Sequence, residues 1–187
     1  MSEISLILIR HGEASEAWGT NPDPGLSSEG INQAKLLVKN DELSSLETFK
    51  FISSPKARAQ MTAEPLVKEF KKELIIDDTF SEIPSDNIKP SKKREWLTDI
   101  MKMNIEDLPT GVVDWRSAIH KKTLAASQNT IIFTHFMVIN SLVAELIASQ
   151  NLLYFYTDYT SITKLIISDG KVKEFFIGGE KKTTINL

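Results

Sequence analysis

Short runs of branched apolar residues alternate along this 187-residue chain with stretches whose apolar residues recur at helical spacing. The runs have the length and β-branched composition of buried strands. They lie at residues 4–9, 49–53, 74–76 and 129–134, and further strands are predicted at 152–156, 161–168 and 172–177. Helices are predicted at 28–40, from about 56 onward, and at 95–103, 112–126 and 138–148. The dipeptide Asp169-Gly170 is typical of a two-residue hairpin turn.

This alternation predicts an α/β fold, a three-layer sandwich in which a mainly parallel central sheet carries helices on both faces. We expect a single domain over residues 1–187, since no linker, repeat or low-complexity tract interrupts the pattern. The segment 83–110 is broken by three prolines and is expected to form an irregular insertion over one end of the sheet. Pro65 is expected to kink the second helix or to start a new segment.

The amino-acid composition indicates which classes of protein and partner are compatible with this chain. The chain is 41% hydrophobic and 25% charged, typical of a soluble globular protein. Its formal net charge of -3 gives no basic field, so we expect neither nucleic acid nor a membrane as a partner. The absence of cysteine excludes disulfides and thiolate metal sites and fits a reducing, cytoplasmic location. No apolar stretch approaches the roughly 20 residues that span a bilayer.

Candidate chemistry begins where the first strand ends, at Arg10, His11 and Gly12. Active sites of open α/β sheets lie just beyond the carboxyl ends of the strands. An arginine there can hold an anion through its planar fork of donors. A histidine there can act as nucleophile, base or ligand, although a lone histidine after a strand is often only a hydrogen-bonded loop residue.

Three more residues whose side chains can bind an anion or transfer a proton follow the ends of other predicted strands: Arg58, Glu82 and His135. In a parallel sheet these residues would converge with Arg10 and His11 at one edge. Two arginines and two histidines suit a dianionic phosphate, and a glutamate can supply the acid that cleavage of an unactivated ester needs. The third histidine, His120, lies in a predicted helix and is expected to be exposed to solvent.

These residues stand in motifs that resemble the histidine phosphatase superfamily, which has the phosphoglycerate-mutase-like fold. The opening signature is Arg10-His11-Gly12-Glu13, and a second motif runs from Asp23 and Leu26 through Ser27, Gly30, Gln33 and Ala34. The third is Ser53-Ser54-Pro55 with Arg58 and Ala59, and Glu82 and His135 match the family's later glutamate and second histidine. The resemblance therefore covers most of the chain.

The resemblance implies a phosphatase that needs no metal and no other cofactor. His11 would attack phosphorus and become phosphohistidine, while Arg10, Arg58 and His135 hold the phosphoryl oxygens. Glu82 would protonate the leaving oxygen and then activate water. Asp86 and Glu13 are rivals for that acid role, because the sequence after Glu82 departs from the family pattern.

Other departures bear on the substrate. Phe136 follows His135, where the family usually has glycine and the acid phosphatase and phytase branch has aspartate. The chain is also too short for the insertions of the mutases, so mutase activity is not expected. Its opening resembles that of short bacterial phosphatases, including the phosphohistidine protein phosphatases.

The substrate is expected to be a small phosphorylated molecule or a phosphoprotein, and the alternative to an enzyme is a phosphate-binding protein without catalysis. The basic cluster Lys92-Lys93-Arg94 is more typical of a solvated surface than of a lid over an anionic substrate. The sequence does not indicate an oligomeric state.

Overall fold

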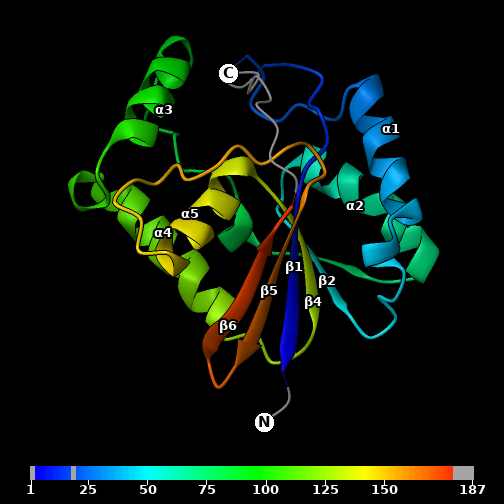
Figure 1. Ribbon diagram of the computed structural model, residues 1–187. Helices are drawn as coiled ribbons and strands as arrows, with labels where there is room; N and C mark the ends of the chain where they lie inside the picture. The colour runs from blue at the N-terminus through cyan, green and yellow to red at the C-terminus, as the bar shows by residue number, and fades with distance from the viewer. Residues whose placement is uncertain (1–2, 18–19, 179–187) are drawn as a thin grey trace.

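A computed structural model describes residues 3–17 and 20–178, and a six-stranded sheet forms its centre (Figure 1). The strands are β1 (Ile4–Arg10), β2 (Lys50–Ser53), β3 (Leu74–Ile76), β4 (Thr130–Thr134), β5 (Ile162–Ser168) and β6 (Lys171–Ile177). They lie in the order β3-β2-β4-β1-β5-β6. The four strands β1 to β4 are parallel to one another, whereas β5 is antiparallel to both β1 and β6.

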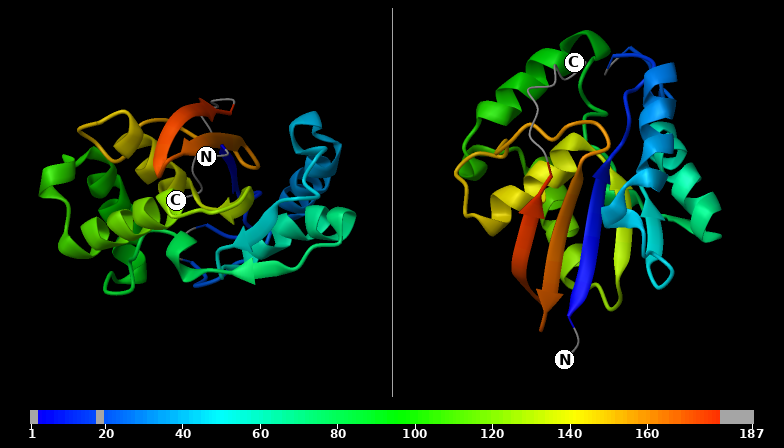
Figure 2. Two further views of the ribbon diagram at one scale, coloured as in Figure 1. Left: turned by 90° about the horizontal axis from the view of Figure 1, so that it is seen from below. Right: turned by 45° about the vertical axis from the view of Figure 1, so that its right-hand side comes forward.

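Helices cover both faces of this sheet (Figure 2). They are α1 (Ser28–Leu36), α2 (Ala57–Phe70), α3 (Lys93–Lys102), α4 (Thr110–Leu124) and α5 (Phe136–Leu146). Short 3₁₀ helices lie at Leu37–Lys39, Asp41–Leu43, Asp78–Phe80, Pro90–Lys92 and Ile105–Asp107. The predicted three-layer α/β sandwich with a mainly parallel sheet is thereby confirmed.

The side-chain alternation of β1 divides the core into two clusters. Leu6 and Leu8 pack on the face covered by α4 and α5, whereas Ile7 and Ile9 pack on the face covered by α2 and the end of α1. All four side chains are buried. Since successive strand residues point to opposite faces, an apolar residue at every position of β1 is what a strand buried on both faces requires.

The segment 83–110 contains the helix predicted at 95–103, which is α3, and two short 3₁₀ helices that the sequence did not indicate. Leu97, Ile100 and Met101 of α3 join a third apolar cluster with Phe136 and Met137, at the start of α5. α5 begins directly after β4, so this cluster fixes the segment near the carboxyl ends of the parallel strands, where Figure 1 shows α3.

One predicted strand was wrong, and no new segment starts at Pro65 in the second helix. Residues 152–156 form no strand, because the amides of Tyr154 and Phe155 donate to the Asn140 side chain and not to a neighbouring strand. The second helix continues as α2 through Pro65, since buried Ala63 and Leu66 anchor it to the sheet on both sides of the proline.

The structure also tests the predictions for the hairpin turn, for His120 and for membrane-spanning segments. Asp169 and Gly170 both have positive φ, as a two-residue hairpin turn demands, so the predicted turn is confirmed. His120 is half-buried and not fully exposed. Among the described residues, no helix has the length and apolar character needed to cross a membrane.

Candidate active site

The structure brings the sequence-predicted residues together at the carboxyl edge of the parallel strands. Arg10 is the last residue of β1, Arg58 lies in the first turn of α2, and His135 is the residue before α5. The backbone amide of His11 donates to the Thr134 carbonyl at 2.9 Å, which fixes His11 beside the end of β4. The exposed fractions of Arg10, His11, Arg58 and His135 are only 2%, 7%, 5% and 0%.

The hydrogen bonds of His11 define its tautomer. Its Nδ1 lies 2.7 Å from the Gly12 carbonyl oxygen, which can only accept, so Nδ1 carries the hydrogen. Nε2 therefore carries no hydrogen, and its lone pair accepts a hydrogen bond from Arg58 Nε at 3.1 Å. Burial lowers the pKa of His11 well below its usual value, and the charges of Arg58 and Arg10 lower it further. The ring is thus neutral at pH 7 and can act as a nucleophile through Nε2.

His135 is the opposite tautomer to His11, with its hydrogen on Nε2. Arg58 Nη2 donates to its Nδ1 at 3.2 Å, so Nε2 carries the hydrogen and donates to Ser54 Oγ at 2.7 Å. Burial lowers the pKa of His135 well below its usual value, with further lowering from Arg58 and then His11. The two histidine rings are 5.2 Å apart between centroids. A single guanidinium group, that of Arg58, therefore contacts both.

Arg10 is held by aromatic rings and a backbone carbonyl. Its Nη1 donates to the Thr157 carbonyl at 2.6 Å, and its Cζ lies 4.1 Å from the Tyr159 ring centroid and 5.1 Å from that of Phe136. Phe136, which stands where the family usually has glycine, is thus an apolar wall that supports the arginine. Burial lowers the pKa of Arg10 from its usual value, although the group stays charged at neutral pH.

Neither buried arginine has a close carboxylate. Among residues 3–17 and 20–178, no ion pair within 4 Å involves Arg10 or Arg58, and Arg10 Nε has no hydrogen-bond partner. Buried charges are normally paired. Two unpaired cations beside a histidine lone pair therefore make a site suited to an anionic ligand such as a phosphoryl group.

Glu82 lies close enough to this site to interact electrostatically with both arginines. Its Oε1 accepts from the Ile83 amide at 2.9 Å, and the Met137 amide in the first turn of α5 also donates to the carboxylate. Burial raises the pKa of Glu82, and this effect exceeds the opposing effects of the amides and arginines. A raised pKa favours the protonated form that a general acid needs.

The two rival carboxylates are placed less favourably. Glu13 accepts a hydrogen bond from Ser27 Oγ at 2.6 Å, and Ser27 in turn caps α1. Asp86 is exposed, although it lines the same cavity as Glu82. The geometry therefore favours Glu82 as the acid.

A cavity of about 670 Å³ opens beside Arg58 and Glu82. Its walls come from residues 20–24, from the start of α2 and from the 83–93 segment. Lys93 is the member of the basic cluster that lines it, while Lys92 forms an exposed ion pair with Glu95. The loop at residues 13–25 contributes to this wall, and its residues Trp18 and Gly19 lie outside the described part of the chain.

Close backbone packing holds the nucleophile loop in place. A Cβ on Gly12 would lie 2.8 Å from the Gly30 carbonyl oxygen, and one on Gly30 would lie 2.1 Å from that of Glu13. The Gly12 amide also donates to Thr62 Oγ1 at 3.0 Å, and this hydroxyl donates to the Arg58 carbonyl at 2.7 Å. The loop that carries His11 is thereby tied to the helix that carries Arg58.

Sequence reasoning missed the supports of the site, namely Ser54 as a partner of His135, and Thr157 and Tyr159 around Arg10. Thr157 and Tyr159 precede β5, whose antiparallel direction brings its amino end to the catalytic edge. Among the described residues, no group of three or more histidine, aspartate or glutamate side chains is placed to hold a metal ion.

Three solved structures that share this fold are each less than 25% identical to this chain. An alpha-ribazole phosphatase from Shigella flexneri has a TM-score of 0.74 at 20% identity, over 94% of this chain and 96% of that one. A mycobacterial glucosyl-3-phosphoglycerate phosphatase has 0.73 at 19%, over 95% and 100%. A phosphoserine phosphatase from Entamoeba histolytica has 0.71 at 22%, over 98% and 100%.

The sequence was also compared with curated proteins and with protein-family models. The search among curated proteins gave no match. The family model described as histidine phosphatase superfamily (branch 1) matches residues 6–175.

Proposed function

This chain belongs to the histidine phosphatase superfamily, and we propose that it is a metal-independent phosphatase that hydrolyses a phosphomonoester through a phosphohistidine at His11. The observation that carries the proposal is the arrangement of His11 itself. Its Nδ1–H is held by the Gly12 carbonyl, while its Nε2 lone pair faces a guanidinium group in a buried site with two unpaired arginines.

In the first step, the Nε2 lone pair of His11 attacks phosphorus and the bond to the ester oxygen breaks. Glu82 gives its proton to that oxygen, so the leaving group departs as an alcohol. The imidazole becomes positively charged, and the Gly12 carbonyl stabilises it through the Nδ1 hydrogen bond. The raised pKa of Glu82 supports this role as proton donor.

In the second step, the carboxylate of Glu82 takes a proton from water as the water oxygen attacks phosphorus. The bond between phosphorus and Nε2 breaks, which regenerates neutral His11 and protonated Glu82 and releases inorganic phosphate. Throughout, Arg10 and Arg58 stabilise the charge on the phosphoryl oxygens, and His135 joins them when its Nε2 hydrogen turns from Ser54 Oγ to a phosphoryl oxygen. Phosphoryl transfer depends mainly on such positioning and charge stabilisation.

The cavity beside Glu82 favours a small-molecule substrate over a phosphoprotein, because its volume of about 670 Å³ lies within the range of small-ligand pockets. Three proteins of the same fold are named as phosphatases of glucosyl-3-phosphoglycerate, alpha-ribazole phosphate and phosphoserine. These names suggest a compact phosphomonoester as the first class to test.

The test is phosphate release by the full chain from a panel of phosphomonoesters and a phosphohistidine peptide, with and without EDTA. We expect turnover that EDTA does not reduce, that is lost in His11→Ala and that is kept in the matched control His120→Ala. Loss of activity in EDTA, or activity that survives in His11→Ala, would contradict the mechanism. Phosphate binding without turnover of any substrate would favour a non-catalytic phosphate-binding protein.

A further inference from the structure

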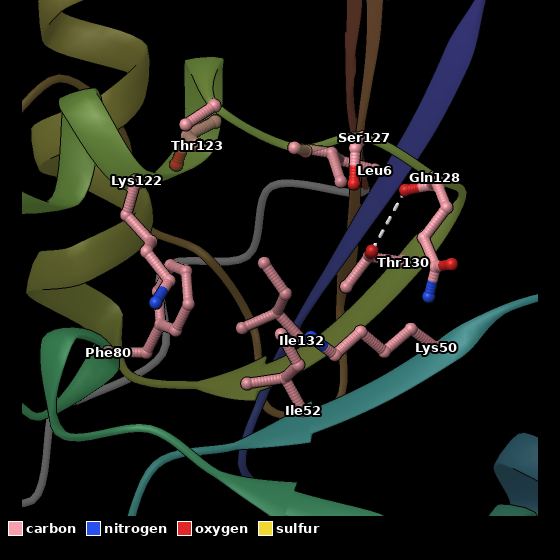
Figure 3. Close-up of a pocket in the computed structure, with 12 residues that line it drawn as sticks. Leu6, Lys50, Ile52, Phe80, Lys122, Thr123, Ser127, Gln128, Thr130 and Ile132 are labelled. Atoms are coloured by element: carbon pink, nitrogen blue, oxygen red, sulfur yellow. Dashed lines mark hydrogen bonds between the residues drawn. The ribbon is translucent and has the colours of Figure 1, made fainter.

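A second cavity lies at the opposite end of the sheet from His11, near the amino ends of β1 and β4 (Figure 3). Its volume is about 400 Å³, and it is bounded by the last turn of α4, residues 125–128 and the sheet. In β4, Thr130 and Ile132 line it, and β4 reaches the catalytic edge only at its other end. None of the five predicted catalytic or phosphate-binding residues lines this cavity.

The floor of the cavity is apolar and belongs to the core. Leu6, Ile52, Phe80 and Ile132 are all buried members of the cluster on the α4 and α5 face. The register aligns Leu6 of β1 and Lys50 of β2 with Thr130 of β4. The floor is therefore a continuous patch of sheet, with Phe80 of the 3₁₀ helix Asp78–Phe80 beside it.

Positive charge enters this cavity from two sides. Figure 3 shows the Lys50 side chain extending over the apolar floor toward Ile132, while Lys122 extends from α4 toward Phe80. Lys122 is paired with Asp77 at 2.9 Å, whereas Lys50 has no ion-pair partner among the described residues. An ammonium group with no counter-charge above an apolar floor favours an anion with an apolar body.

A buried polar group without a partner also lines the cavity. Thr123, on the last turn of α4, is 2% exposed, and its Oγ1 has no hydrogen-bond partner among the residues described. Buried hydroxyl groups are normally hydrogen-bonded, because leaving one unsatisfied is costly. The hydroxyl lies out of reach of solvent, and a turn of the Thr123 side chain would bring it to a ligand oxygen in the cavity. By contrast, the Thr130 hydroxyl already donates to the Gln128 carbonyl at 2.9 Å.

From this arrangement we propose a second, non-catalytic site that binds a small organic anion with a compact apolar body, such as an aryl carboxylate. The apolar body lies on Ile52, Phe80 and Ile132. The anionic group lies at Lys50, with Lys122 and the Thr123 hydroxyl as further donors. The site does not depend on the proposed phosphatase activity.

The test is a nitrogen-proton NMR titration of the full chain with three probes that share a phenyl group: phenylpropionate, phenylethylphosphonate and the neutral phenylpropanol. Orthovanadate is added so that the probes do not compete for the catalytic pocket. The titration is repeated with Lys50→Met, which keeps the side-chain length and removes the charge. Lys39→Met is the matched control, since Lys39 is an exposed lysine on the other side of the sheet.

We expect chemical-shift changes that centre on residues 122–132, with the anions binding about tenfold more tightly than the alcohol, as expected for a partly buried ion pair. Lys50→Met should remove most of that preference, and Lys39→Met should leave it intact. The two anionic probes distinguish a carboxylate from a phosphate-bearing ligand. Any one of three results would overturn the proposal. The anions and the alcohol could bind with equal affinity, the two lysine variants could show the same preference for anions, or the chemical-shift changes could lie only outside residues 122–132. The comparison of probes on the wild-type chain tests the site even if a variant is unstable.

Discussion

Replacing Arg58 tests the shared phosphoryl pocket most sharply, because this side chain contacts both histidines. Its Nε and Nη2 lie 3.1 Å from His11 Nε2 and 3.2 Å from His135 Nδ1. Arg58→Lys keeps the positive charge but has one ammonium group in place of a planar fork, so it cannot place two donors at these positions. Removal of one preorganised oxyanion donor costs roughly 10²–10³-fold in kcat.

We therefore expect Arg58→Lys to lower kcat/KM by about 10²–10³-fold, equal to roughly 3–4 kcal/mol of transition-state stabilisation. Arg58→Met should lower it further, because it also removes the charge that depresses the pKa of His11. With that charge gone the pKa of His11 rises, so the acid limb of the kcat/KM profile should move to higher pH. Arg58→Lys should leave that limb nearer its wild-type position.

The assay is steady-state phosphate release across pH for both variants, with circular dichroism to show that each is folded. Arg94→Lys is the matched control, since Arg94 is exposed on α3. Activity of Arg58→Lys within about threefold of wild type would refute the shared-pocket reasoning. An acid limb that stays fixed in Arg58→Met would refute the electrostatic part of it.

Three further predictions follow from other contacts of the site. Glu82→Gln should slow the first step, measured as the burst of leaving-group release, by roughly 10²–10⁴-fold for an alkyl phosphate but barely for p-nitrophenyl phosphate, whose leaving group needs no proton; equal slowing of the two bursts would favour Asp86 or Glu13 as the acid. Phe136→Leu keeps an apolar wall but removes the ring near Arg10, so kcat/KM should fall roughly 2–30-fold, with Phe176→Leu on β6 as the unaffected control. Because burial lowers the pKa of both His11 and His135, the unfolded chain binds more protons near and below about pH 6.5, so the free energy of unfolding should fall as pH drops from 7.5 to 5.5. The urea titrations use Glu82→Gln, because the raised pKa of Glu82 acts in the opposite direction; a constant value in that variant would contradict the assignment of neutral histidines.

Much of the fold could be predicted because the central strands β1 and β4 are buried on both faces. A run such as residues 4–9 has an apolar side chain at every position, and few other structures accommodate that pattern. The site could be predicted for a related reason. Its residues lie at or just after the ends of strands that are parallel to one another, so their positions in the sequence indicated a common edge of the sheet. These residues are Arg10, Arg58, Glu82 and His135.

The remaining features depend on tertiary contacts that no local pattern encodes. The segment 152–156 has strand-like composition, yet its amides are satisfied by the buried Asn140 side chain. Pro65 remains within α2 because the packing of its neighbours outweighs the local preference for a break. Tyr159 reaches Arg10 only because β5 is antiparallel to β1, and the hairpin signal at residues 169–170 fixed the direction of β6 relative to β5 alone.

The central claim is that His11 becomes covalently phosphorylated, and trapping that species tests it most directly. Full chain mixed with substrate is quenched rapidly without acid and digested, and the peptides are analysed by mass spectrometry. With p-nitrophenyl phosphate as substrate, the account predicts phosphate on the peptide that contains His11 in the wild type, more of it in Glu82→Gln, where only the second step is slowed, and none in His11→Ala. Phosphate on the peptide that contains His135, or turnover with no phosphorylated peptide at all, would contradict it.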